Sequence, residues 1–231
     1  MQYVLITGVS SGLGEALAKA YLNKGATVYA IGKNLPVKLD LNPHFFFFPY
    51  DLNQTFLLKA SLREFLQYHT FDIVILNAGI LGGIQTLANT DLLDIKEIMD
   101  INVWANKELI DTLSDCAKVK QIVGISSGAA VNASKGWGAY ALSKASLNML
   151  FSIYAKELPL IHFTTLAPGI IRTAMVEHII ENVDDDLFPS VKKLKAGEIQ
   201  TPQAAAEYLL TIFPKLLDYE SGSFLDVRTM T

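Results

Sequence analysis

The sequence has few of the residues from which disulfides, metal sites and membrane anchors are built. Its 231 residues include a single cysteine, Cys116, so no disulfide can form within the chain and no cysteine cluster can hold a metal. The four histidines show no ligand spacing, and no apolar run approaches the ~20 residues that a membrane-spanning helix requires. The first residues also lack the basic segment of a signal peptide. We therefore expect a cytoplasmic protein without a bound metal.

Charge is also sparse. Charged residues make up 18% of the chain, hydrophobic residues make up 51%, and the formal net charge is −4. A negative balance disfavours sequence-independent binding to nucleic acid or to an anionic membrane. The hydrophobic fraction excludes a disordered chain, and a chain of this length can bury a large core. No linker, repeat or low-complexity stretch divides the sequence, so we expect one domain over residues 1–231.

Short apolar runs alternate with segments of helical periodicity along the chain. Strands separated by helices pair in parallel, and strands that are apolar on both faces have helices on both sides. The pattern predicts an α/β fold with a doubly wound parallel sheet of about seven strands. The expected strands are 3–7, 26–31, 44–49, 71–76, 119–125, 160–167 and 223–227. The expected helices are 12–22, 54–68, 91–117, 138–157 and 202–213, and residues 174–199 read as irregular.

The first strand-to-helix turn reads Thr7-Gly8-Val9-Ser10-Ser11-Gly12-Leu13-Gly14. Ligands of such sheets bind at the carboxyl ends of the strands, beside the first one. Glycines allow positive φ, and they let a pyrophosphate approach the backbone and the positive end of the helix. The spacing is not G-x-G-x-x-G, because Leu17 stands at the third glycine position. Spacing alone leaves ordinary turn chemistry open, and the strand-turn-helix context favours a phosphate site.

Tyr140 and Lys144 stand four residues apart in a predicted helix, so their side chains share one face. An ammonium beside a phenol favours the phenolate, and it would lower the pKa of tyrosine from its ordinary value near ~10. Taken alone, such a pair is more often an ordinary surface feature. The other motifs of the chain favour a catalytic pair.

Five motifs follow one another in order. They are Thr7-Gly-x-x-x-Gly-Leu-Gly14, Asn77-Ala78-Gly79, Ser127, Tyr140-x-x-x-Lys144, and Pro168-Gly169 followed by Thr173. Together they resemble the short-chain dehydrogenase/reductase family, which interconverts carbonyls and alcohols with a nicotinamide cofactor on a Rossmann-type domain. The segments Gly136–Tyr140 and Ser221–Val227 are similar to its sepiapterin-reductase-like and benzil-reductase-like branch.

The resemblance implies the catalytic roles. Tyr140 would give a proton to the carbonyl oxygen during reduction, and Ser127 would donate a hydrogen bond to the same oxygen. Lys144 would hold the nicotinamide ribose hydroxyls and lower the tyrosine pKa. Asn102 matches the asparagine that holds a water behind the lysine, although an asparagine bordering a helix is an alternative interpretation.

The resemblance also implies the cofactor-binding residues. The pyrophosphate turn would contribute Gly8, Ser10, Ser11, Gly12, Leu13 and Gly14. The adenosine half would meet Asp51, Leu52, Asn77, Ala78 and Gly79, and the nicotinamide end would meet Pro168, Gly169, Ile171 and Thr173. Asp51 would bind the adenine amino group, with a helix N-cap as its alternative role and Asn53 as a competitor for that role. Leu76 replaces the first of two asparagines that the family often has.

The end of the second strand bears on the choice between NAD and NADP. A carboxylate there would bind the ribose 2′-hydroxyl of NAD, and this chain has Gly32 instead. Lys33 follows, where NADP-binding members often carry arginine. Ser11 takes the place of a second basic residue, and Ser10 and Ser11 could still bind a phosphate. We expect a preference for NADP(H), with NAD(H) possible.

The substrate end is less defined. Residues 174–199 should form a lid, and their charged runs read as solvated surface. The expected walls are apolar and favour a ketone or diketone with an apolar or aromatic flank: Ile80, Leu81, Ala129, Val131, Trp137 and Met175. A catalytically silent regulator or scaffold is the alternative, and the joint presence of four catalytic residues favours an enzyme. The resemblance further implies a homodimer or homotetramer formed through helices 91–117 and 138–157.

Overall fold

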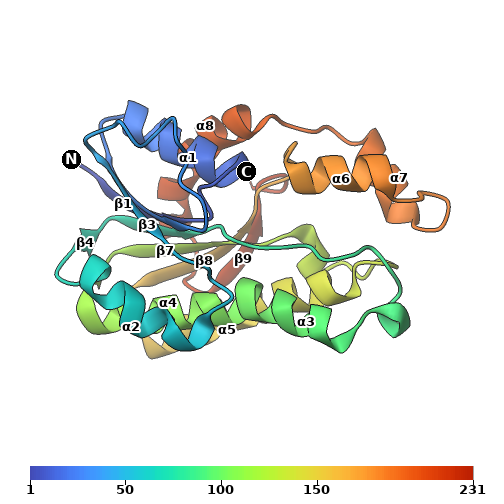
Figure 1. Ribbon diagram of the computed structural model, residues 1–231, viewed down its shortest axis with the longest axis horizontal. Helices are drawn as coiled ribbons and strands as arrows, with labels where there is room; N and C mark the ends of the chain where they lie inside the picture. The colour runs from blue at the N-terminus through green and yellow to red at the C-terminus, as the bar shows by residue number, and fades with distance from the viewer. Residues whose placement is uncertain (231) are drawn as a thin grey trace.

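The computed structural model describes residues 1–230 and confirms the doubly wound α/β sheet (Figure 1). Seven strands form one sheet in the order β3-β2-β1-β5-β7-β8-β9, and all neighbouring pairs are parallel. The strands of this sheet are β1 (Tyr3–Thr7), β2 (Thr27–Gly32), β3 (Phe45–Pro49), β5 (Ile73–Leu76), β7 (Gln121–Ile125), β8 (His162–Ala167) and β9 (Ser223–Asp226). The chain adds β2 and β3 on one side of β1 and the later strands on the other side. A crevice for ligands is expected at this switch point beside β1.

Two of the expected strands are interrupted at their amino ends. The short strands β4 (Thr70–Phe71) and β6 (Lys118–Val119) pair with each other in a separate two-stranded sheet. Asp72 leaves this pairing because its backbone N–H donates to the carbonyl of Tyr3, and the N–H of Lys120 donates to the carbonyl of Phe71. One residue therefore separates each short strand from the strand of the main sheet that follows it.

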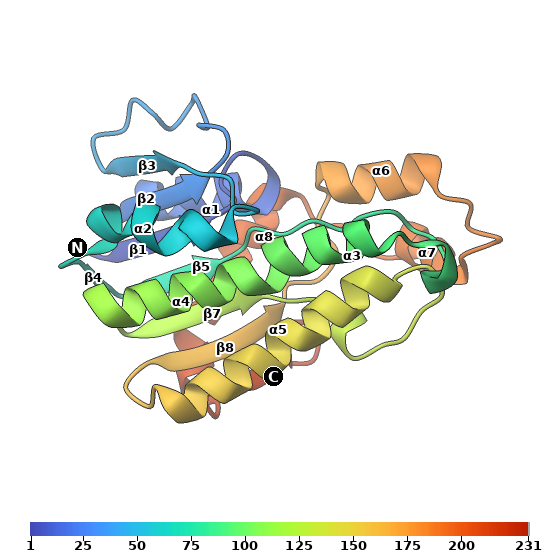
Figure 2. The ribbon, with the colours of Figure 1, turned by 60° about the horizontal axis from the view of Figure 1, so that its bottom comes forward.

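Helices cover both faces of the sheet (Figures 1 and 2). They are α1 (Gly12–Asn23), α2 (Thr55–Leu66), α3 (Leu92–Met99), α4 (Ala105–Cys116), α5 (Gly138–Glu157), α6 (Ala174–Asn182), α7 (Pro189–Ala196) and α8 (Pro202–Ile212). A π-helical turn (Asp100–Trp104) joins α3 to α4, and 3-10 turns occur at Leu87–Asn89, Gly128–Ala130 and Phe213–Asp218. Within residues 1–230, no helix is long and apolar enough to cross a membrane.

Each face of the sheet has its own core. Leu17 of α1 and Leu209 of α8 pack with Ile6 on one face, whereas Leu109 of α4 and Phe151 of α5 pack with Leu5 on the other. Alternate residues of β1 thus point to opposite layers, and both layers are apolar, as parallel sheets require. The strands of the sheet are therefore packed between two helical layers.

The expected irregular stretch 174–199 is a correction. It contains α6 and α7, which lie together at one end of the molecule (Figure 1, orange). Thr173 caps α6, since its hydroxyl accepts from the N–H of Val176, and Pro189 begins α7, a position that tolerates proline. The acidic residues 184–186 separate the two helices, and Met175, Val176, Ile179 and Ile180 recur with helical spacing within α6.

Candidate active site

The residues expected to be catalytic converge from separate elements. Ser127 follows β7, Tyr140 and Lys144 lie on the first two turns of α5, and Asn102 lies in the π-helical turn. A cavity of about 640 Å³ is lined by Ser127, Tyr140 and Lys144. Asn102 is fully buried and does not line this cavity. The structure thus brings three of the four side chains to one surface and places the fourth beneath it.

Burial dominates the electrostatics of the tyrosine–lysine pair. The Nζ of Lys144 lies 5.6 Å from the centre of the Tyr140 ring and donates to the carbonyl of Ile125 at 2.8 Å. Burial raises the pKa of Tyr140 to about 12, and a hydrogen bond with the Ser127 side chain offsets only part of this rise. Burial also lowers the pKa of Lys144 to about 8. Burial therefore opposes the predicted lowering of the tyrosine pKa by Lys144, and it is the largest cause of the shift in this arrangement.

Asn102 ties the loop after β5 to α5. Its Oδ1 accepts from the N–H of Ile80 at 2.8 Å, and its Nδ2 donates to the carbonyl of Ile80 at 2.8 Å and to the hydroxyl of Ser143 at 2.9 Å. Ser143 in turn donates to the carbonyl of Tyr140. The buried Nδ2 of Asn106 donates to the carbonyl of Asn102 at 2.7 Å. Asn102 therefore does more than border a helix, because its hydrogen bonds link the loop after β5 to Ser143 of α5.

The glycine turn is packed against the loop after β5. The hydroxyl of Thr7 accepts from the N–H groups of Asn77 and Ala78, and the Nδ2 of Asn77 donates to the carbonyls of Thr7 and Gly8. A Cβ on Gly8 would lie 2.8 Å from the Cα of Ala78, and one on Gly14 would lie 2.1 Å from the carbonyl oxygen of Gly8. Both positions therefore require glycine. Asn77 stabilises the turn, which is a role that the sequence had not assigned to it.

The start of α1 fits a bound phosphate. The N-cap residue Ser11 makes no side-chain hydrogen bond to the helix, so the first N–H groups of α1 have no side-chain cap. Gly12 has a φ of +60°, and its Cα lies close to the side chain of Thr173. A Cβ on Gly79 would lie 3.0 Å from the Oδ1 of Asn102 and 3.4 Å from the Nζ of Lys144. The bare backbone between these elements is the kind of surface that a dinucleotide can approach.

Lys33, which was expected to favour NADP, is paired with Asp51, which was expected to bind the adenine amino group. The Nζ of Lys33 lies 2.9 Å from a carboxylate oxygen of Asp51, and this lysine holds the pKa of that carboxyl below its ordinary value. Asp51 also accepts from the N–H of Asn53, and Gln54 is the N-cap of α2, so Asp51 is not an N-cap. Ser10 is bound to the backbone N–H and carbonyl of Asn34.

The remaining predicted contacts divide into those that line the cavity and those that do not. Lining residues include Leu13, Asn77, Gly79, Pro168, Gly169, Ile171 and Thr173 at the cofactor side, and Leu81, Ala129, Trp137 and Met175 at the substrate side. Ile80 and Val131, which were expected in the wall, do not line it, and Val131 is 62% exposed. Ala78 and Leu52 pack in the core instead.

Several residues of the cavity were missed by sequence reasoning. Lys193 lies on α7, Glu198 follows α7, and Arg228 follows β9. Their positions depend on contacts between distant parts of the chain. Asn106 could have been found, because it lies one helical turn after Asn102 on the same face. In the described part of the chain, no cluster of three histidine, cysteine or acidic side chains could hold a metal ion.

Comparisons with known proteins agree with this geometry. The family model for the short chain dehydrogenase matches residues 2–184. An uncharacterized oxidoreductase of Schizosaccharomyces pombe is 34% identical, with 98% of this chain and 96% of the relative covered. A benzil reductase ((S)-benzoin forming) of Bacillus cereus is 30% identical, with 95% of each chain covered.

A sepiapterin reductase of Bos taurus is 30% identical over 67% of this chain and 61% of the relative. The crystal structure of a short chain dehydrogenase/reductase from Saccharomyces cerevisiae superimposes with a TM-score of 0.83 at 26% identity, covering 98% of this chain and 96% of that one. Both branches to which the sequence is similar are thus represented among the relatives. The chain belongs to the short-chain dehydrogenase family of oxidoreductases.

Proposed function

We propose that this protein reduces a ketone or diketone with an apolar or aromatic flank to an alcohol, with NADP(H) as the preferred cofactor. The observation that carries this proposal is the convergence of Ser127, Tyr140 and Lys144 on one cavity. A protein that only bound a nucleotide would have no need for a buried acid, a buried cation and a hydroxyl donor on the same wall. The convergence therefore favours an enzyme over a silent scaffold.

The side chains suit the proton transfer of a reduction. Since the pKa of Tyr140 is near 12, its phenol keeps its proton at neutral pH and can give it to the carbonyl oxygen as negative charge develops there. Ser127 would donate a hydrogen bond to the same oxygen, and its benefit is largest in the transition state. Lys144 would stabilise the phenolate that remains and would hold the ribose hydroxyls. The nicotinamide, when bound, supplies the hydride.

The preference for NADP(H) rests on the end of β2. Gly32 presents no carboxylate that would repel a 2′-phosphate, and Lys33 offers an ammonium with 68% of its side chain exposed. Because Lys33 pairs with Asp51 at 2.9 Å, a phosphate would compete with a carboxylate for this lysine. NADP(H) would therefore be favoured without NAD(H) being excluded.

The walls and a relative support the substrate class. Leu81, Trp137 and Met175 present apolar surface to the cavity. The relative from Bacillus cereus, with 95% of each chain covered, acts by its name on benzil, which is a diketone with two aromatic flanks. A lid formed by 174–199 would close this chamber, since Ile179 and Val191 of α6 and α7 already form a buried cluster with Leu81.

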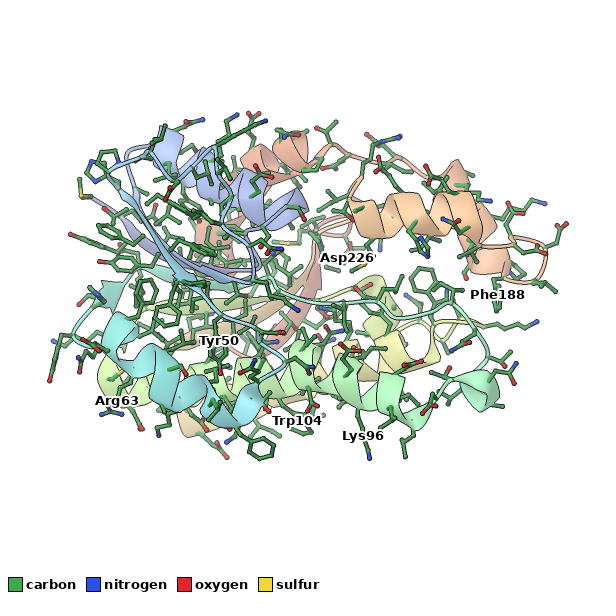
Figure 3. All side chains as sticks on the ribbon, in the orientation of Figure 1. Tyr50, Arg63, Lys96, Trp104, Phe188 and Asp226 are labelled. Carbon is green, nitrogen blue, oxygen red and sulfur yellow. The ribbon has the colours of Figure 1, made fainter. Side chains whose placement is uncertain are left out.

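A homodimer or homotetramer would use the outer surfaces of α4 and α5, which lie side by side in Figure 2. Met149 and Ile153 of α5 are 63% and 46% exposed, and Trp104, at the surface in Figure 3, is 45% exposed. Light scattering on the purified protein would give its mass in solution. A mass close to the 25.4 kDa of one chain would contradict this part of the proposal.

The Tyr140→Phe variant tests the enzyme directly. Removal of one hydroxyl should lower the turnover of benzil with NADPH by roughly 10²- to 10⁴-fold, the usual contribution of a general acid. Binding of NADPH, followed by the fluorescence of the reduced nicotinamide, should stay within a few-fold of that of the wild type. Equal turnover by the two proteins, or turnover by neither protein on a panel of ketones and diketones, would overturn the proposal.

A further inference from the structure

Arg228 is held at the catalytic end of the sheet by strand pairing. The strand β9 pairs with β8 so that Asp226 stands beside Ala167, and the N–H of Val227 donates to the carbonyl of Ala167 at 3.1 Å. Arg228 therefore leaves the sheet next to Pro168, and it lines the same cavity as Ser127. In Figure 3, Asp226 is seen near the middle of the molecule, between the sheet and the start of α6.

The guanidinium of Arg228 is paired with Asp226, and 57% of the arginine side chain is exposed. Its Nε and Nη2 donate to the two carboxylate oxygens of Asp226 at 2.9 and 2.5 Å, and its backbone N–H donates to the same carboxylate at 3.0 Å. A fork of this kind favours one orientation of the planar group. Of the five N–H donors of an arginine, Asp226 engages two, so three point elsewhere.

Gly128 places this guanidinium beside the catalytic serine. A Cβ on Gly128 would lie 3.2 Å from the Nη2 of Arg228, so the guanidinium lies close to the backbone of this glycine. Gly128 directly follows Ser127, and consecutive Cα atoms are only about 3.8 Å apart. The Nδ2 of Asn132 lies 3.8 Å from the same Cβ position and donates to the carbonyl of Gly128 at 2.9 Å. Gly128 thus lies between two sets of hydrogen-bond donors. One set is the hydroxyls of Ser127 and Tyr140, and the other is the guanidinium of Arg228.

The charges around Arg228 decide which acceptor it suits. Asp226 neutralises the guanidinium at close range, and Lys193 and Glu198 place opposite charges on the same cavity. The arginine therefore offers directed N–H groups rather than a free positive charge, which suits a neutral carbonyl oxygen better than a carboxylate. The other side of the cavity, with Trp137 and Met175, is apolar.

We propose that Arg228 is a specificity-determining residue that binds a second carbonyl oxygen, on the carbon next to the carbonyl that is reduced. This inference rests on the proposed function and narrows its substrate class to neutral 1,2-dicarbonyl compounds with an apolar flank. Ser127 and Tyr140 bind the oxygen that becomes the alcohol, and Arg228 binds the oxygen that stays a ketone. The neighbouring carbonyl positions the substrate and selects which carbon is reduced.

The experiment compares two substrates that differ in one oxygen. With NADPH, kcat/KM is measured for 1-phenyl-1,2-propanedione and for propiophenone, which lacks the second carbonyl, in the wild type, Arg228→Met, Arg228→Gln and the distant surface variant Arg63→Met. Loss of a hydrogen bond from a charged donor should lower kcat/KM for the dione by roughly 10- to 100-fold in Arg228→Met. Propiophenone should change by less than about threefold, which also shows that the variant is folded, since surface substitutions have small effects.

The other variants separate the explanations. Arg228→Gln keeps an N–H donor without charge and should retain part of the preference for the dione, whereas Arg63→Met should behave as the wild type. A wild type that reduces both substrates equally well, or an Arg228→Met that loses both equally, overturns the role of Arg228 and leaves the proposed function standing. A wild type that reduces no carbonyl compound overturns both.

Discussion

Two lysines, one at each end of the proposed cofactor site, differ in their surroundings. Lys144 is 4% exposed, donates to the carbonyl of Ile125, and has its pKa lowered to about 8 by burial. Lys33 has 68% of its side chain in solvent and is paired with Asp51. Burial changes the energy of a charge, whereas solvent screens an exposed pair. The buried lysine can therefore tune the chemistry, and the exposed lysine can only shift a preference between cofactors.

Replacement of the buried lysine should have the largest effect. Lys144→Met should lower turnover by roughly 10²-fold or more, because it removes the cation that stabilises the phenolate. It should also change how stability depends on pH. The folded pKa of about 8 lies below the ordinary value near 10.5, so between these values the unfolded chain binds more protons and the stability of the wild type rises with pH.

Urea unfolding at pH 7, 8.5 and 10 measures this difference. The free energy of unfolding of the wild type, relative to that of Lys144→Met, should rise by about 2–3 kcal/mol over this range. Tyr140 is present in both proteins, so its own titration cancels. If the two proteins kept a constant difference in stability from pH 7 to 10, Lys144 would not carry a burial-shifted pKa, and the contrast between the two lysines would be lost.

A smaller effect is expected from crowding at the buried end. In Gly79→Ala, the added Cβ would lie 3.0 Å from the Oδ1 of Asn102 and 3.4 Å from the Nζ of Lys144. Over-tight packing of this kind costs about 1–3 kcal/mol, and it should reduce turnover roughly tenfold by displacing Asn102 and the lysine. Gly83→Ala is the matched control, since its Cβ would meet no atom closer than 3.7 Å. Steady-state kinetics and urea unfolding should separate the two variants. Identical behaviour would show that the backbone around Gly79 shifts enough to accommodate the added Cβ.

The exposed lysine should give the smallest effect. Lys33→Ala should raise the KM for NADPH by about two- to fivefold and leave that for NADH nearly unchanged, because an exposed ion pair contributes at most about 1 kcal/mol. Lys38→Ala, on the same exposed loop, serves as the control. The NADPH and NADH constants are measured side by side. An equal change for both cofactors would mean that Lys33 does not distinguish them.

The sequence predicts local features of this fold well. The helix that carries Tyr140 and Lys144 has the expected bounds, 138–157, because its apolar positions recur with helical spacing and a glycine-rich turn precedes it. The glycine turn after β1 was likewise predicted from Gly8, Gly12 and Gly14, since a short strand and a helix flank it. Features that are encoded within a few residues of one another can be read without a structure.

Features that depend on distant contacts were missed. The pKa of Tyr140 depends on how completely the fold buries it, and spacing from Lys144 does not reveal that. Arg228 enters the cavity only because β9 pairs with β8, and Asn77 stabilises the glycine turn across 70 residues of sequence. Tertiary contacts decide these features. The helix α6 is different, because Met175, Val176, Ile179 and Ile180 have helical spacing and could have been recognised in the sequence.

The parallel pairing of the main sheet has a consequence for how each newly made chain folds. Each pair of neighbouring strands must wait for an intervening helix or long loop to collapse, and such long-range closure slows folding. During that delay the apolar run Phe45–Phe48, which forms an edge strand with one neighbour, is available to another copy of the chain. Crowded, newly made chains therefore risk aggregation, and recovery after denaturation should be best in dilute solution.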